Sequence, residues 1–179
     1  MSASGQKRSS SISKSRAFQI GFEAPIQGVS MRITQDLRAN EILRIEHLLE
    51  GFNYSIWINT YGPFDLNRTL EEQLAHSTGN EVIIGGQSCV TSSEARSEVT
   101  EQLLHVGDGG YGPLDLNAKR SEILNLLEDL FMHVRLDQAS TITSFWLTKG
   151  HPSYPVFWDF AFDIQNGGKR WILMGSSSD

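Results

Sequence analysis

Two acidic residues and a histidine near the C-terminus are the side chains best placed for acid–base chemistry. Asp159 and Asp163 share one face of a predicted strand, and His151 lies in the Gly-His-Pro-Ser-Tyr turn that precedes it. Because a strand rises about 3.3 Å per residue, the two carboxylates would lie roughly 13 Å apart, too far for a glycosidase pair. His151 with Asp159 is therefore the weak candidate for a catalytic pair, and binding by Tyr154, Asp159 and Asp163 is the alternative.

The same acids also have a purely structural interpretation. Acids on a half-exposed strand face commonly pair with basic side chains of a neighbouring strand. Lys149, Lys169 and Arg170 lie in the adjoining predicted strands and loops. Asp159 and Asp163 would then stabilise the sheet and contact no ligand.

Cysteine and histidine spacing gives no support for a metal site. Cys89 is the only cysteine, which excludes an intramolecular disulfide and a thiolate cluster and fits a reducing, cytoplasmic location. None of the five histidines lies three or four residues from another, so no helix carries a His-Glu-x-x-His zinc site. Cys89 precedes a predicted helix, where a thiolate can be stabilised, but a small buried cysteine is the preferred interpretation. The sequence therefore predicts no metal and no cofactor.

A heptapeptide occurs twice in the chain. Residues 61–67, Tyr-Gly-Pro-Phe-Asp-Leu-Asn, recur 50 positions later at 111–117 with one substitution in seven. Both copies precede helix-like sequence, and Gly-Pro followed by Asp or Asn favours a turn that introduces a helix, capped by Asn117 in the second copy. The alternative is a repeated binding loop. In that interpretation the binding residues are Tyr61, Asp65, Tyr111 and Asp115.

Three strands near the C-terminus would position these side chains. Residues 154–164 alternate between the two faces of a strand, and the apolar face comprises Val156, Trp158, Phe160, Phe162 and Ile164. Residues 165–169 contain Asn and two glycines, which favour a tight hairpin, and an apolar stretch follows. With the β-branched stretch at 141–148, this pattern predicts a three-stranded antiparallel meander.

Helical periodicity precedes the meander and alternates with short strand-like segments. Thr69 with Glu72 and Thr91 with Glu94 have the spacing of capping boxes, which mark helix starts. Phe52 continues the apolar face of the first helix. Helices are expected at 35–50, after Thr69, between Thr91 and Gly107, and at 117–134, and strands at 18–22, 29–33, 52–60 and 81–85. We therefore predict an α+β fold: a mostly antiparallel sheet with a C-terminal β-meander and helices packed on one face.

Charge divides the chain into two parts. Residues 1–16 are basic, Ser-rich and nearly without apolar side chains, whereas residues 17–179 hold 11 basic and 21 acidic residues. We predict a disordered tail at 1–16 and a single α+β domain at 17–179. A body of net charge −10 disfavours direct nucleic acid binding, which depends on Lys and Arg at phosphates. No apolar run approaches the roughly 20 residues that span a bilayer, so no membrane partner is expected.

An acidic body without an assembled catalytic motif favours a non-enzymatic protein-binding role. The most specific form of this hypothesis is a small immunity or antitoxin-like inhibitor, whose charge would speed association with a basic protein partner. A small enzyme or ligand-binding domain with a pocket near His151 and Asp159 is the alternative. A structural or assembly subunit is the third interpretation.

Overall fold

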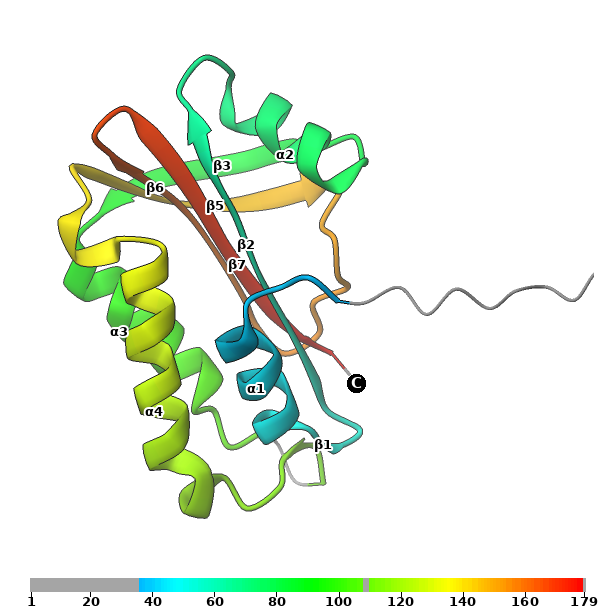
Figure 1. The fold of residues 1–179 in the computed structure, drawn as a ribbon. Coiled ribbons are helices and arrows are strands. Elements are labelled where there is room, and N and C mark those ends of the chain that lie inside the picture. The colour runs from blue at the N-terminus through cyan, green and yellow to red at the C-terminus, as the bar shows by residue number, and fades with distance from the viewer. Residues whose placement is uncertain (1–35, 108–109, 179) are drawn as a thin grey trace, which may run out of the picture. The chain divides into compact units, whose positions relative to one another are not determined.

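The computed structural model describes residues 36–107 and 110–178, in which helices and strands alternate before a final meander (Figure 1). The predicted tail at 1–16 and the predicted strands at 18–22 and 29–33 lie outside the described residues. No helix in the described ranges is long and apolar enough to cross a bilayer. In chain order the elements are α1 (Asn40–Leu49), β1 (Gly51–Phe52), β2 (Ser55–Asp65), α2 (Leu70–Thr78), β3 (Ile83–Val90), α3 (Ser92–Leu103), β4 (Gly112–Pro113), α4 (Leu116–His133), the 3-10 helix η1 (Leu136–Gln138), β5 (Thr141–Lys149), β6 (Asp159–Asn166) and β7 (Lys169–Ser178).

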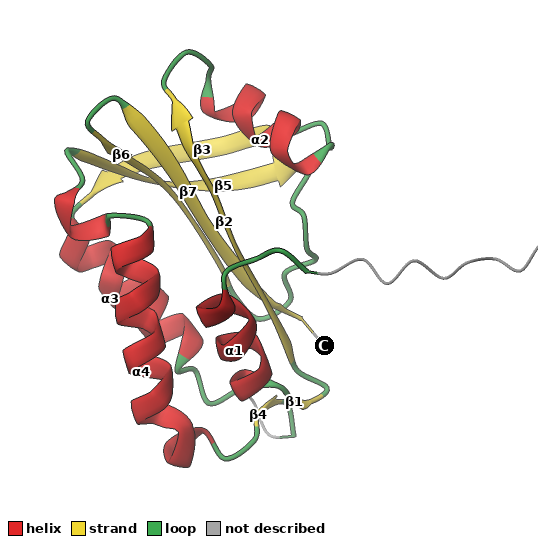
Figure 2. Ribbon diagram, in the orientation of Figure 1, coloured by secondary structure: helices red, strands yellow, loops and turns green. Residues whose placement is uncertain are grey.

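Five strands form one antiparallel sheet in the order β2-β7-β6-β5-β3 (Figure 2). Strands β5, β6 and β7 are the predicted meander. Asn166 pairs with Lys169 across a two-residue turn, where Gly167 and Gly168 have φ of 56° and 77°. Glycine adopts this conformation without a steric penalty, as the hairpin prediction requires. The predicted α+β fold with a mostly antiparallel sheet and a C-terminal meander is confirmed.

The larger core lies between one face of the sheet and the helices α1, α3 and α4, which are grouped together in Figure 1. Phe160, Phe162 and Ile164 of β6 point into this core, as their alternation predicts. The stripe of α4 also lies here, including Ile123 and Leu127. Fully burying such a side chain contributes about 1.5–3 kcal/mol, so this layer supplies most of the apolar stabilisation.

The short helix α2 forms a second core with the other residues of the sheet. Leu70 and Leu74 of α2 are buried with Ala161, Ile172 and Met174. A capping box at Thr69 begins this helix, as its spacing predicts. The sequence pattern leaves the Ala161 face of β6 half-exposed, but the structure buries it because α2 supplies apolar side chains to it.

The two heptapeptide copies adopt different structures. The first continues β2, where Phe64 pairs with Arg170 after a bulge, so the turn predicted at its start is wrong. Gly62 has φ of 116°, and a Cβ there would lie 2.5 Å from the Arg170 carbonyl oxygen. The second copy forms β4 and then the start of α4, whose N-cap is Asp115 and not the predicted Asn117. Pairing with β7 determines the conformation of the first copy, whereas the second pairs with the two-residue strand β1.

Strand β3 is longer than its predicted range of 81–85. Gly85 and Gly86 stay in the strand, and the Trp146 side chain of β5 lies across both, where any Cβ would overlap it. An aromatic ring covering edge glycines restores the packing surface that glycine lacks. Cys89 therefore belongs to this edge strand and is exposed, so the prediction of a small buried cysteine is wrong.

Candidate functional site

Exposed apolar side chains gather around the two-stranded ribbon of β1 and β4. Phe52 and Val106 are 67% and 73% exposed, and Tyr111 and Leu114 are also exposed. These four side chains belong to one surface groove of about 330 Å³, which we call the ribbon groove. Its lining residues are Phe52, Val106, Gly110, Tyr111, Gly112, Pro113 and Leu114. Such a contiguous apolar patch is typical of an interaction surface, whereas exposed apolar residues scattered singly are ordinary.

Close backbone packing builds the ribbon. Gly51 pairs with Pro113, and Phe52 pairs with Gly112. A Cβ on Gly51 would overlap the Gly112 carbonyl oxygen, and one on Gly107, whose φ is 76°, would overlap the carbonyl oxygen of Tyr111. Glycine is needed at both positions because no side chain fits between the two backbones. The two chain segments therefore hold the groove residues in a defined arrangement.

An aromatic contact joins the ribbon to the sheet. The ring of Tyr111 lies 6.3 Å from that of Phe157, and the Phe157 ring lies 5.8 Å from that of Tyr54, measured between centroids. The Tyr54 hydroxyl accepts a hydrogen bond of 3.0 Å from Trp158 Nε1 inside the core. Tilted aromatic pairs at these separations are favourable, so they anchor the ribbon beside the larger core.

Charged residues adjoin the groove residues along the chain. Glu50 precedes β1 and Asp115 follows Leu114, and both acids are exposed. Lys119 donates a hydrogen bond of 2.8 Å to the Leu48 carbonyl oxygen, and Arg120 borders an adjoining groove beside Val106. An apolar centre with a polar rim is the usual anatomy of a protein interface.

Of the sequence candidates, Tyr111 and Asp115 lie at the ribbon groove, whereas Phe52, Val106 and Leu114 were missed. Periodicity assigns Phe52 to the apolar face of the first helix, but α1 ends at Leu49 and Phe52 points to solvent. Val106 continues the apolar period of the helix predicted to end at Gly107, but α3 ends at Leu103, and Leu114 stands beside Pro113 outside any regular period. Large apolar residues in the segment between two predicted helices are the signal that could have identified the groove.

Tyr61 and Asp65 occupy β2, away from the second copy of the heptapeptide in the fold. Tyr61 is partly buried against the second core, next to Trp57 and Phe64, and burial raises the pKa of its hydroxyl. Asp65 forms an exposed ion pair with Lys169. Tyr61 and Tyr111 therefore pack against different apolar clusters, and the structure does not bring them together around one ligand.

Asp163 is a buried structural residue. Its carboxylate accepts a hydrogen bond of 2.8 Å from Arg170 Nε, and the two side chains are 5% and 9% exposed. Gln165 Nε2 donates to the same carboxylate, and Arg170 Nη1 donates to the Arg68 carbonyl oxygen. Asp163 therefore pairs with a neighbouring strand, as the structural interpretation of the sequence expects, and it is inaccessible to a partner.

His151 and Asp159 have separate surroundings. His151 Nδ1 lies 3.1 Å from the Ser153 amide, and its ring lies 5.9 Å from that of Trp57. Asp159 is exposed at the start of β6, where its charge acts on Glu98 of α3. No hydrogen bond or ion pair in the described part of the chain joins His151 to Asp159. Tyr154, in the loop before β6, is 82% exposed.

Asp159 contributes to the titration of Glu98. Burial raises the pKa of the Glu98 carboxyl, and the charges of Asp159 and Glu101 raise it further. Because the folded pKa exceeds the unfolded one, the folded chain binds this proton more tightly, and stability falls as pH rises between the two values. The Asp159→Asn substitution is expected to lower the Glu98 pKa, measured by NMR titration of its side-chain carboxyl. The matched Asp129→Asn variant should leave the Glu98 pKa unchanged. An equal Glu98 pKa in the wild type and in both variants would contradict the effect of Asp159 on Glu98.

Comparison of the chain with protein-family models, with curated proteins and with solved structures found no match.

Proposed function

We propose that this protein is a non-enzymatic protein-binding module whose ribbon groove receives an apolar side chain of a basic partner protein. Four exposed apolar side chains around one groove carry the proposal. Covering them removes apolar surface from water, which is the main favourable term in most protein association. In its most specific form, the protein is a small inhibitor of the immunity or antitoxin type that acts in the cytoplasm.

The charge of the body supports a basic partner. Residues 17–179 carry a net charge of −10, and the exposed acids Glu50 and Asp115 lie close in sequence to the groove residues Phe52 and Leu114. Opposite charge on a partner raises the association rate, and salt screens this attraction over a Debye length of about 8 Å at physiological ionic strength. Apolar contact at the groove would then determine how long the complex lasts.

The Phe52→Ala substitution tests the groove directly. Phe52 is expected to act as a hot spot, so its removal should weaken partner affinity by about 2 kcal/mol or more, roughly 30-fold. The partner is captured from an extract of cells that make this protein, identified by mass spectrometry, and its affinity measured with purified proteins. Met132→Ala is the matched control, because Met132 on α4 has the same 67% exposure as Phe52 but lies outside the groove.

Salt separates the electrostatic part of the proposal from the apolar part. Raising salt should slow association with the wild type, and the Phe52→Ala variant should show the same salt dependence at lower affinity. A partner that binds the Phe52→Ala and Met132→Ala variants with equal affinity would contradict the groove assignment. A partner whose association rate is independent of salt would contradict the role of the acidic body.

A further inference from the structure

The outer edge of β2 is blocked at one residue by an ion pair from outside the sheet. The Ile58 amide donates a hydrogen bond of 2.7 Å to Glu46 Oε1, and the Ile58 carbonyl oxygen accepts one of 2.7 Å from Arg38 Nη1. Arg38 and Glu46 also pair with each other, so together they occupy the place of a neighbouring strand. Edge strands commonly carry such devices because an unpaired edge recruits other chains.

The ion pair of Arg38 and Glu46 does not cover the preceding outward-facing residue, Ile56. Backbone groups alternate in direction along an antiparallel strand, so Ile56 faces outward like Ile58. Its cross-strand neighbour on β7, Ser177, bonds on its other side to Val156 and Trp158, which confirms this orientation. No side chain in the described part of the chain bonds the Ile56 amide or carbonyl as Arg38 and Glu46 bond those of Ile58.

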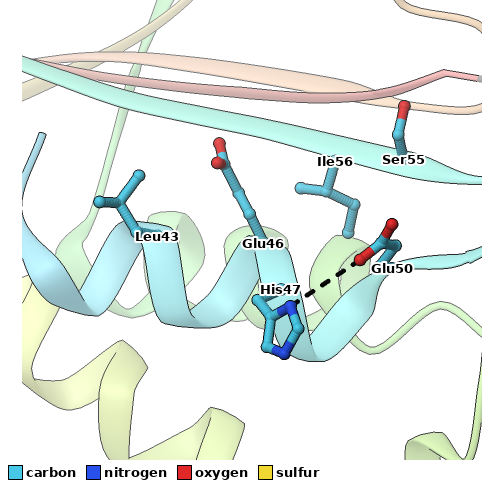
Figure 3. Close-up of a pocket in the computed structure, with 6 residues that line it drawn as sticks. All are labelled: Leu43, Glu46, His47, Glu50, Ser55 and Ile56. Atoms are coloured by element: carbon cyan, nitrogen blue, oxygen red, sulfur yellow. Dashed lines mark ion pairs between the residues drawn. The ribbon is translucent and has the colours of Figure 1, made fainter. Parts of the chain in front are cut away.

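A groove lies beside this open position. It has a volume of about 300 Å³ and is bounded by α1 on one side and the start of β2 on the other. Figure 3 shows Glu46 directed from α1 toward β2, and an ion pair of 3.8 Å between His47 and Glu50 below Ile56. Leu43 and Ser55 complete its lining. The groove therefore combines a backbone edge that the described residues leave unpaired with the exposed carboxylate of Glu50.

We infer that this groove binds an extended basic segment of a partner protein, which pairs with the backbone of Ile56 and places a lysine or arginine beside Glu50. The inference rests on the proposed protein-binding function and adds a second contact to the ribbon groove. Backbone pairing supplies two hydrogen bonds, and the Glu50 carboxylate selects the charge. A second copy of the chain is a poor occupant, because two bodies of net charge −10 repel each other.

The free protein provides the first part of the test. The Ile56 amide is expected to exchange with solvent faster than the Ile58 amide, since the bond from Ile58 to Glu46 must break before exchange. Exchange is measured by NMR on the full chain. An Ile56 amide protected as well as that of Ile58 would overturn the inference, because the edge would already be occupied.

The second part uses the peptide acetyl-Ser-Val-Arg-Val-Ser-amide as the probe. Its addition should shift the Ile56 amide resonance saturably and slow its exchange, whereas the same peptide with Glu in place of Arg should do neither. Glu50→Gln should weaken binding by about two- to fivefold, as expected for an exposed ion pair. Glu81→Gln is the matched control, because Glu81 is similarly exposed and also forms one ion pair, with Lys149.

Three results with the peptide would overturn the inference. These are no saturable shift, equal binding of the acidic peptide, and peptide shifts centred on Phe52 and Tyr111. A shift of Ile56 that depends on protein concentration alone would assign the edge to a second copy and would also overturn it. The partner affinity of the Phe52→Ala variant is measured separately, so failure of the peptide test and failure of the proposed function are distinguishable.

Discussion

Replacing Asp163 with alanine is expected to lower the free energy of unfolding by about 3–5 kcal/mol. The substitution leaves the Arg170 guanidinium, whose side chain is 9% exposed, without its carboxylate partner. An unpaired buried charge loses its hydration and gains nothing in return, which makes breaking a buried pair far more costly than losing an exposed one. The remaining bond from Arg170 to the Arg68 carbonyl oxygen cannot neutralise the charge.

The neighbouring ion pair provides a matched control for this measurement. Asp65 and Lys169 also join two adjacent strands near the same hairpin, but their side chains are exposed. Asp65→Ala should therefore cost less than about 1 kcal/mol in urea unfolding followed by circular dichroism. Equal losses from Asp65→Ala and Asp163→Ala would contradict the assignment of Asp163 to the buried interior.

The Phe162→Ala substitution is expected to lower the free energy of unfolding by about 3–5 kcal/mol as well. Phe162 is fully buried in the larger core, and its ring stacks at 6.2 Å from that of Phe160. Truncation removes transfer free energy and leaves a cavity that the surrounding strands and helices fill only in part. Urea unfolding of the variant measures the loss.

Phe52→Ala is the control for Phe162→Ala, because both remove a phenylalanine ring. Phe52 is mostly exposed at the ribbon groove, so its removal should change stability by less than about 0.5 kcal/mol. A large loss of stability in Phe52→Ala would show that the ring is part of the core and would weaken its assignment to partner binding.

The local pattern predicts the meander, because alternation, turn residues and strand pairing are all short-range there. The apolar face of β6 and the Gly167-Gly168 turn follow from the sequence alone. Burial of the opposite face does not, because Ala161 on that face packs with Leu70 and Leu74 of α2, which lies about ninety residues earlier in the chain. The identity of the covering element is a tertiary property that no short window of sequence contains.

The repeated heptapeptide shows the same limit. Nearly identical residues form part of a strand at 61–65 and a ribbon followed by a helix start at 112–116. Register with β7 fixes the first copy, whereas contact with Gly51 fixes the second. The ribbon groove was missed for a related reason: Phe52 meets the periodicity of α1, but the helix ends before it.

Site-specific photo-crosslinking tests the central claim most directly. A benzoylphenylalanine side chain replaces Tyr111 in one protein and Met132 in another, and both are irradiated in the cells that make the natural protein. The ribbon-groove proposal predicts a crosslink to one basic partner from position 111 and none from position 132. A partner that crosslinks from position 132 and not from position 111 would contradict the proposal.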